Sequence, residues 1–112
     1  MLVDVGEVST RCELLGAAAA TPVMVAPVAF QKLAHPEGEA AMARAAAAAG
    51  SVFCLSTLAT SRPSEIAAAA PDGRRVMQLY LFRDRGVTRA LLDEAVAAGF
   101  EAVLLTVDAP YA

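Results

Sequence analysis

The chain has 112 residues, of which 57% are hydrophobic and 19% are charged. This composition excludes a disordered chain and is typical of one domain with a single core. The formal net charge of −3 argues against nucleic acid or an anionic membrane as a partner, because both require clustered cations. No run reaches the roughly 18 to 20 apolar residues of a membrane span, and we expect no signal peptide, because an aspartate stands in the first residues, MLVDVGEVST.

The two cysteines, Cys12 and Cys54, stand outside any CxxC or Cys/His spacing. We therefore expect neither a disulfide framework nor a metal site of zinc or another ion. Buried free thiols in a reducing compartment are the expected alternative, which favours a cytoplasmic location.

The secondary-structure pattern becomes regular after residue 21. Before that point, residues 11–16 (RCELLG) could form a short strand, and residues 16–21 (GAAAAT) are predicted to form a loop. Short apolar runs then alternate with helix patterns. The runs predict four buried strands, at residues 22–27, 51–56, 75–82 and 100–108.

Three helices are predicted between these strands. The first has Pro36 in its first turn, carries Glu37 and Glu39 near its positive end, where carboxylates are favourable, and ends just before Gly50. The second begins at Pro63, and the third covers residues 86–99 with apolar residues at helical spacing. Because a helix and no hairpin turn separates each pair of strands, the sheet should be parallel.

Two α/β designs fit this alternation. A flavodoxin-like or Rossmann sheet needs a glycine-rich turn after its first strand, but the stretch APVAFQKLAHPEG contains neither GxGxxG nor GxxxxGK[ST]. The other design is a TIM barrel, in which functional residues gather at the carboxyl ends of the strands. The predicted fold class is therefore α/β, a partial (β/α)8 TIM barrel with about four parallel βα units.

Each predicted strand ends in polar or backbone-exposing residues, and residues two apart on a strand share one face. These residues are Pro27, Val28 and Ala29 after the first strand, Ser56 after the second, Gln78 and Tyr80 on the third, and Thr106 and Asp108 on the fourth. One such residue is usually a turn residue. Four strand ends in succession also favour a ligand site, and the pattern alone leaves both interpretations open.

Four stretches of the chain resemble the FMN-dependent α-hydroxy acid dehydrogenases and oxidases, the family of glycolate, lactate and mandelate oxidases and flavocytochrome b2. They are, in order, PVMVAPVAFQKLAHPEGEAAMARAAAAAG, LSTLATS, MQLYLFRDR and AGFEAVLLTVDAPYA. The blocks AHPEGE, QLY and TVDAP are specific, and the resemblance covers essentially the whole chain. It implies FMN as cofactor and part of an enzyme that oxidises an L-2-hydroxy acid to the 2-oxo acid, with O2 or another acceptor reoxidising the flavin.

The resemblance also assigns roles to the strand-end residues. The backbone of residues 27–29 would lie against the flavin ring near N5, while Ser56, Gln78 and Thr106 would hydrogen-bond its pyrimidine side. Tyr80 would lie near the substrate carboxylate or hydroxyl, and Asp108 would hold and charge-stabilise the catalytic histidine.

Two further residues, His35 and Leu58, differ from the catalytic and substrate-site residues of the family. His35 is the only histidine, but it stands outside the family's base position, so we expect it to cap a helix or pack in a loop. Leu58 occupies a position where some relatives carry an aromatic residue beside the substrate, which predicts a differently shaped pocket.

A complete TIM barrel has eight strands and about 250 residues, whereas this chain supplies four strands. We expect residues 1–112 to form the N-terminal part of an incomplete barrel domain, with the base histidine and the phosphate site beyond residue 112. The expected partners are a small 2-hydroxy acid and the remaining barrel half, and the complete enzyme should be a homo-oligomer. Two alternatives stay open: a catalytically inactive half-barrel that acts only in assembly or binding, and another FMN barrel such as type 2 isopentenyl diphosphate isomerase or IMP dehydrogenase.

Overall fold

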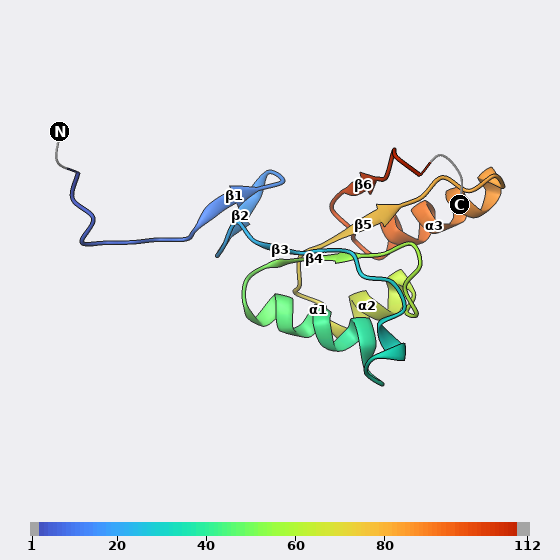
Figure 1. Cartoon of the computed structure of the whole chain (residues 1–112), viewed down its shortest axis with the longest axis horizontal. Helices are drawn as coiled ribbons and strands as arrows, with labels where there is room; N and C mark the ends of the chain where they lie inside the picture. The colour runs from blue at the N-terminus through green and yellow to red at the C-terminus, as the bar shows by residue number, and fades with distance from the viewer. Residues whose placement is uncertain (1–2, 110–112) are drawn as a thin grey trace.

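The structure is a computed structural model that describes residues 3–109. It begins with an extended segment that leads into a hairpin of two antiparallel strands, β1 (Cys12–Leu14) and β2 (Ala17–Ala19) (Figure 1). The short strand expected within residues 11–16 is confirmed, but the loop predicted for residues 16–21 is wrong.

The hairpin is formed by a tight turn and by contacts from Arg74, neither of which shows in the alanine run. Leu15 and Gly16 have φ angles of 53° and 76°, and two central residues with positive φ make the tight turn that suits a two-residue hairpin. The Arg74 guanidinium also donates hydrogen bonds to the carbonyls of Leu14 (2.7 Å) and Ala17 (3.2 Å). Alanine has a low strand propensity, so only the backbone pairing and this arginine clamp reveal the strand.

The remaining strands form one parallel sheet in chain order, as predicted. They are β3 (Met24–Val25), β4 (Val52–Leu55), β5 (Arg75–Leu79) and β6 (Val103–Leu105). Each is shorter at its carboxyl end than its apolar run suggested. Ser56 and Thr106 directly follow β4 and β6, whereas Gln78 lies within β5, one residue before its end.

The helices lie on one side of this sheet (Figure 1). A 3-10 turn, η1 (Gln31–Leu33), precedes α1 (Gly38–Ala48), and α2 (Pro63–Ala69) and α3 (Arg85–Ala97) follow β4 and β5. Asp84 caps α3 by accepting a hydrogen bond from the Gly86 N–H at 2.7 Å. Among residues 3–109, no helix combines the length and apolar character needed to cross a bilayer.

Alternation along the strands divides the core between the two faces of the sheet. On the helix side, Phe53, Leu55 and Met77 pack against small and apolar helix residues, namely Ala43, Ala46, Ile66, Ala70 and Ala95. The alanine runs in and just after α1 and α2 therefore pack closely on the sheet. On the helix-free side, Val52, Cys54 and Val76 form a second cluster that Leu14 of the hairpin helps to cover.

Both cysteines are free, but only one is a buried thiol as expected. Cys54 is 1% exposed, and this burial raises the pKa of its thiol to about 11. Cys12 is only half-buried, because it lies on the short hairpin at the end of the sheet.

Candidate functional site

Three predicted residues meet at the carboxyl ends of adjacent strands. Ser56 follows β4 in phase with Cys54, and Gln78 lies on β5 in phase with Val76. Because Cys54 and Val76 belong to the helix-free side, the polar side chains point to that side as well. Thr106 directly follows β6, the next strand of the sheet.

The Gln78 side chain links the three strand ends. Its Nε2 donates to Thr106 Oγ1 at 2.9 Å, and its Oε1 accepts from the Thr57 N–H at 3.0 Å and from the Ser56 hydroxyl at 3.5 Å. Ser56 and Gln78 are only 6% and 5% exposed. These contacts fix the amide with its NH2 group toward β6. We call Ser56, Gln78 and Thr106 the polar row.

The polar row continues toward the loop after β3. Ser56 Oγ accepts from the Leu58 N–H at 3.1 Å, and the Leu58 carbonyl accepts from the Phe30 N–H at 3.1 Å. Phe30 has a φ of 54°, a strained value for a non-glycine residue, at the point where the chain turns into η1. The predicted ring-contacting residues 27–29 come just before this turn, at the same edge of the sheet as the polar row.

Thr57 is a site residue that the sequence did not reveal. Its hydroxyl donates to the Gln78 carbonyl at 2.6 Å and accepts from the Tyr80 N–H at 3.0 Å. It thereby replaces the ladder bonds that β4 and β5 would otherwise continue. The only signal was a second hydroxyl residue beside Ser56 at a strand end, a pattern that turns also show.

The two predicted catalytic residues lie at the same edge but outside the polar row. Tyr80 is half-buried directly after β5, and Asp108 is exposed three residues after β6. Within the described part of the chain, the hydrogen bonds of the row include neither the Tyr80 phenol nor the Asp108 carboxylate. His35 has the local role expected of it, since its Nδ1 accepts from the Glu37 N–H at 3.2 Å before α1.

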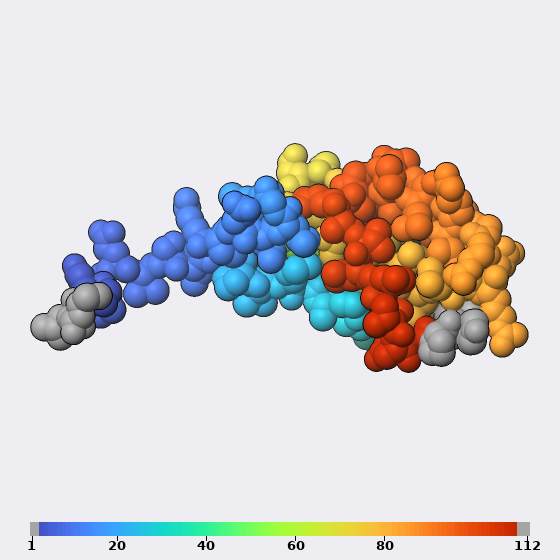
Figure 2. Space-filling model, turned by 90° about the horizontal axis from the view of Figure 1, so that it is seen from above, coloured from blue at the N-terminus to red at the C-terminus, as the bar shows by residue number. Residues whose placement is uncertain are grey.

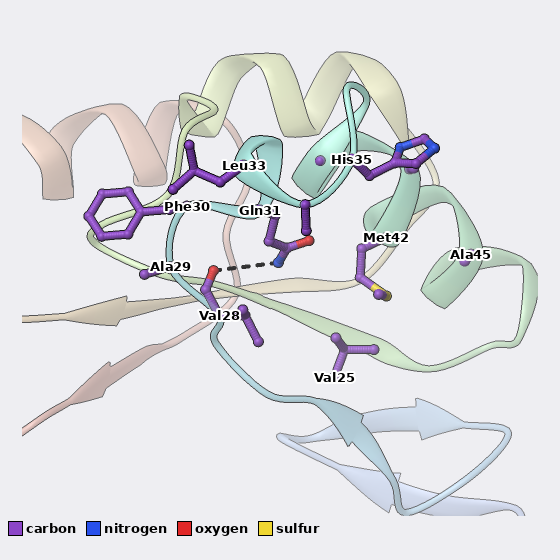
Figure 3. A pocket seen from close by; sticks show the side chains of 12 residues that line it. Val25, Val28, Ala29, Phe30, Gln31, Leu33, His35, Met42 and Ala45 are labelled. Carbon is purple, nitrogen blue, oxygen red and sulfur yellow. Dashed lines mark hydrogen bonds between the residues drawn. The ribbon is translucent and has the colours of Figure 1, made fainter.

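A cavity of about 670 Å³ lies between the loop after β3, η1 and α1 (Figure 3), and its lining includes Val28 and Ala29, two of the predicted ring-contacting residues. Val25, Leu33 and Met42 are among its mainly apolar lining residues, and Val25 also packs on the helix-side core. The cavity therefore belongs to the outer layer of the fold and contains no residue of the polar row. Residues 3–109 also hold no group of three His, Cys, Asp or Glu side chains that could bind a metal ion.

Comparison with known proteins matches this arrangement to one family. The family model described as FMN-dependent dehydrogenase matches residues 1–112. The glycolate oxidase of Spinacia oleracea is 48% identical over 110 residues, which cover 98% of this chain and 30% of the spinach protein. The L-lactate oxidase of Nostoc sp. is 48% identical over 113 residues, which cover 98% of this chain and 31% of that protein.

Solved structures give the same result. A mandelate oxidase variant with a monooxide FMN adduct superposes with a TM-score of 0.90 and 45% identity, over 99% of this chain and 35% of the oxidase chain. The predicted fold class, an α/β partial TIM barrel, is confirmed by this likeness and by the four parallel strands. The chain spans about a third of the length of the proteins it matches. It belongs to the FMN-dependent dehydrogenase family.

Proposed function

We propose that this chain is part of an FMN-dependent 2-hydroxy acid oxidase or dehydrogenase, acting on an L-2-hydroxy acid of the glycolate, lactate or mandelate type. The product would be the 2-oxo acid, with O2 or another acceptor reoxidising the flavin. The observation that carries the proposal is the polar row, a buried amide with hydroxyl groups on either side, at the carboxyl edge of a parallel sheet. Functional residues of TIM barrels gather at this edge.

The chemistry of the polar row fits the pyrimidine edge of FMN. That edge alternates carbonyl acceptors with an N–H donor, and the row offers both kinds of group, because an amide and a hydroxyl each donate and accept. Ser56, Gln78 and Thr106 would hold the edge and place donors where negative charge gathers. The backbone of residues 27–29 would lie against the ring. FMN, when bound, would supply the electron acceptor that no side chain provides.

Tyr80 would contact the substrate, and Asp108 would contact the histidine that acts on it. Both lie at the same edge as the polar row, Tyr80 two residues after Gln78 and Asp108 two residues after Thr106. The Tyr80 phenol would bind the substrate carboxylate or hydroxyl. The Asp108 carboxylate would orient a histidine base and stabilise its protonated form.

The remaining barrel half is part of the proposal. β6 is an edge strand whose residues Val103, Leu104 and Leu105 are 45%, 41% and 48% exposed, and it lies on the molecular surface in Figure 2. At the other edge, the apolar cavity flanks β3 and α1. Apolar surface at both edges supports further βα units beside β3 and β6. The homo-oligomeric state and the cytoplasmic location stay predictions.

A chimera tests the proposed function. Residues 1–112 replace the matching segment of spinach glycolate oxidase, which supplies the rest of the barrel. We expect the chimera to purify with FMN, and glycolate, lactate or mandelate to bleach the flavin absorbance without O2. A folded, FMN-loaded chimera that none of the three acids bleaches would contradict the proposal. The 112-residue chain alone is the control, and we expect it neither to retain FMN tightly nor to oxidise these acids.

Replacing Tyr80 with phenylalanine in the chimera should have a mild effect. The change removes one hydroxyl contact to the substrate, worth about 0.5–1.5 kcal/mol if neutral, so kcat/KM should fall roughly 2- to 12-fold. The Tyr80 N–H keeps its bond to Thr57 Oγ1, so the strand end should hold its shape. Steady-state kinetics measure the change, and an unaltered kcat/KM would remove Tyr80 from the substrate site.

A further inference from the structure

Glu39 is a buried carboxylate that the polar row does not use. It lies in the first turn of α1 and is 0% exposed. A buried charge is costly unless hydrogen bonds satisfy it. Glu39 accepts from the Gln31 N–H (3.2 Å), the Thr60 N–H (2.7 Å), the Thr60 hydroxyl (2.9 Å to Oε1 and 2.7 Å to Oε2) and the Ser61 hydroxyl (3.1 Å).

These donors come from two different loops. Gln31 follows the β3 end that carries residues 27–29, whereas Thr60 and Ser61 follow the β4 end that carries Ser56. Other contacts join the same loops beside the carboxylate. The Lys32 N–H donates to Thr60 Oγ1 at 3.2 Å, and the Lys32 ammonium donates to the Thr60 carbonyl at 3.2 Å. The Glu39 carboxylate is thus the shared acceptor of both loops.

We propose that Glu39 is a positioning residue, which holds the loops after β3 and β4 in one arrangement and thereby aligns residues 27–29 with Ser56 and Leu58. The inference rests on the proposed function, because it is the flavin and the substrate that these groups would face. A helix-dipole role does not account for Glu39, since such a role needs no burial and no donors from two loops. Glu37, which is exposed and paired with Arg44, already supplies a carboxylate at that helix end.

The charge state of Glu39 supports the same role. Burial alone would raise the pKa of its carboxyl, but the hydrogen bonds from Thr60 and the Gln31 N–H outweigh this and lower the pKa to about 2. Because the pKa is lower in the folded state, the ionised carboxylate stabilises the fold. This stabilisation is complete at pH values above the pKa of the unfolded chain, near 4.5. That contribution is lost as the pH falls from there through about 2.

Two variants of the chimera and of the 112-residue chain test the proposal. Glu39→Gln keeps the size but removes the charge, and it places an NH2 group where Oε2 accepts from the Thr60 and Ser61 hydroxyls. Glu37→Gln is the exposed control. We expect Glu39→Gln to lower kcat/KM about 10- to 100-fold and to shift the visible absorption bands of the flavin, and Glu37→Gln to change neither. The stability difference between the native chain and Glu39→Gln should shrink between pH 4.5 and pH 2.

Hydrogen exchange decides the inference separately from activity. The N–H groups of Val28, Ala29 and Leu58 do not contact Glu39, and positioning predicts faster exchange there in Glu39→Gln, even in a chimera that oxidises no acid. Unchanged exchange at these three groups, with an unchanged flavin spectrum, would overturn the inference and leave Glu39 a local structural residue. If Glu39→Gln fails to fold, Thr60→Val removes the hydroxyl that donates to Glu39 and accepts from the Lys32 N–H, and the same readouts apply to it.

Discussion

Replacing Asp108 with asparagine in the chimera is expected to slow flavin reduction by the substrate about 10²- to 10⁴-fold, the range that a positioned acid–base group contributes. Asparagine keeps the size of the side chain but removes the negative charge that would stabilise a histidine as it takes the proton. Asp108 lies beyond the polar row, so FMN affinity should stay within a few-fold of the native value. Anaerobic stopped-flow absorbance and FMN titration measure the two quantities.

Asp93→Asn is the matched control for this change. Asp93 is an exposed aspartate of α3 paired with Arg89 four residues earlier, and such surface pairs contribute little. It should alter neither the reduction rate nor FMN affinity. Small and equal effects of Asp108→Asn on both quantities would show that Asp108 has no part in proton transfer.

Replacing Gln78 with leucine should instead act on FMN binding. The change removes the amide that joins the three strand ends and leaves the Thr106 hydroxyl and the Thr57 N–H without their partner. Each unsatisfied buried polar group lowers the stability of the fold by about 1–3 kcal/mol. The flavin edge would in addition lose its central contact. We expect the dissociation constant of FMN to rise roughly 10- to 1000-fold, measured by quenching of flavin fluorescence.

The other glutamine of the chain provides the control. The Gln31 side chain makes one long contact, 3.5 Å to the Val28 carbonyl (Figure 3), and its bond to Glu39 comes from the backbone. Gln31→Leu should therefore leave FMN affinity nearly unchanged. If both glutamine variants weakened FMN equally, the polar row would have no special part in binding.

Much of the fold could be predicted from the sequence because local patterns carry it. The apolar runs, the helix starts and the alternation of strand and helix predicted β3 to β6 in the correct parallel order. The hairpin was missed at β2, because three alanines show no strand pattern and their pairing depends on Arg74, far along the chain.

The candidate site was predicted as a set of residues but not as a network. The polar positions of Ser56, Gln78 and Thr106 follow from strand phase and from the family resemblance. The linking roles of Thr57 and Glu39 depend mainly on contacts to Gln78, Tyr80, Thr60 and Ser61, which are more than 20 residues away in sequence, and no local pattern encodes such contacts. Glu39 in particular was predicted as a first-turn carboxylate, a position that the structure confirms while it adds the contacts to both loops.

A crystal structure of the FMN-loaded chimera tests the central claim most directly. Val28 and Ala29 also line the apolar cavity beside α1, so a planar ligand against residues 27–29 could lie either at the polar row or in the cavity. The account predicts the pyrimidine edge of the flavin within hydrogen-bond distance, about 2.7–3.2 Å, of the Gln78 amide and the hydroxyls of Ser56 and Thr106, with the ring against residues 27–29. Electron density for the flavin out of contact with Gln78, such as between Leu33 and Met42 in the apolar cavity beside α1, would contradict it.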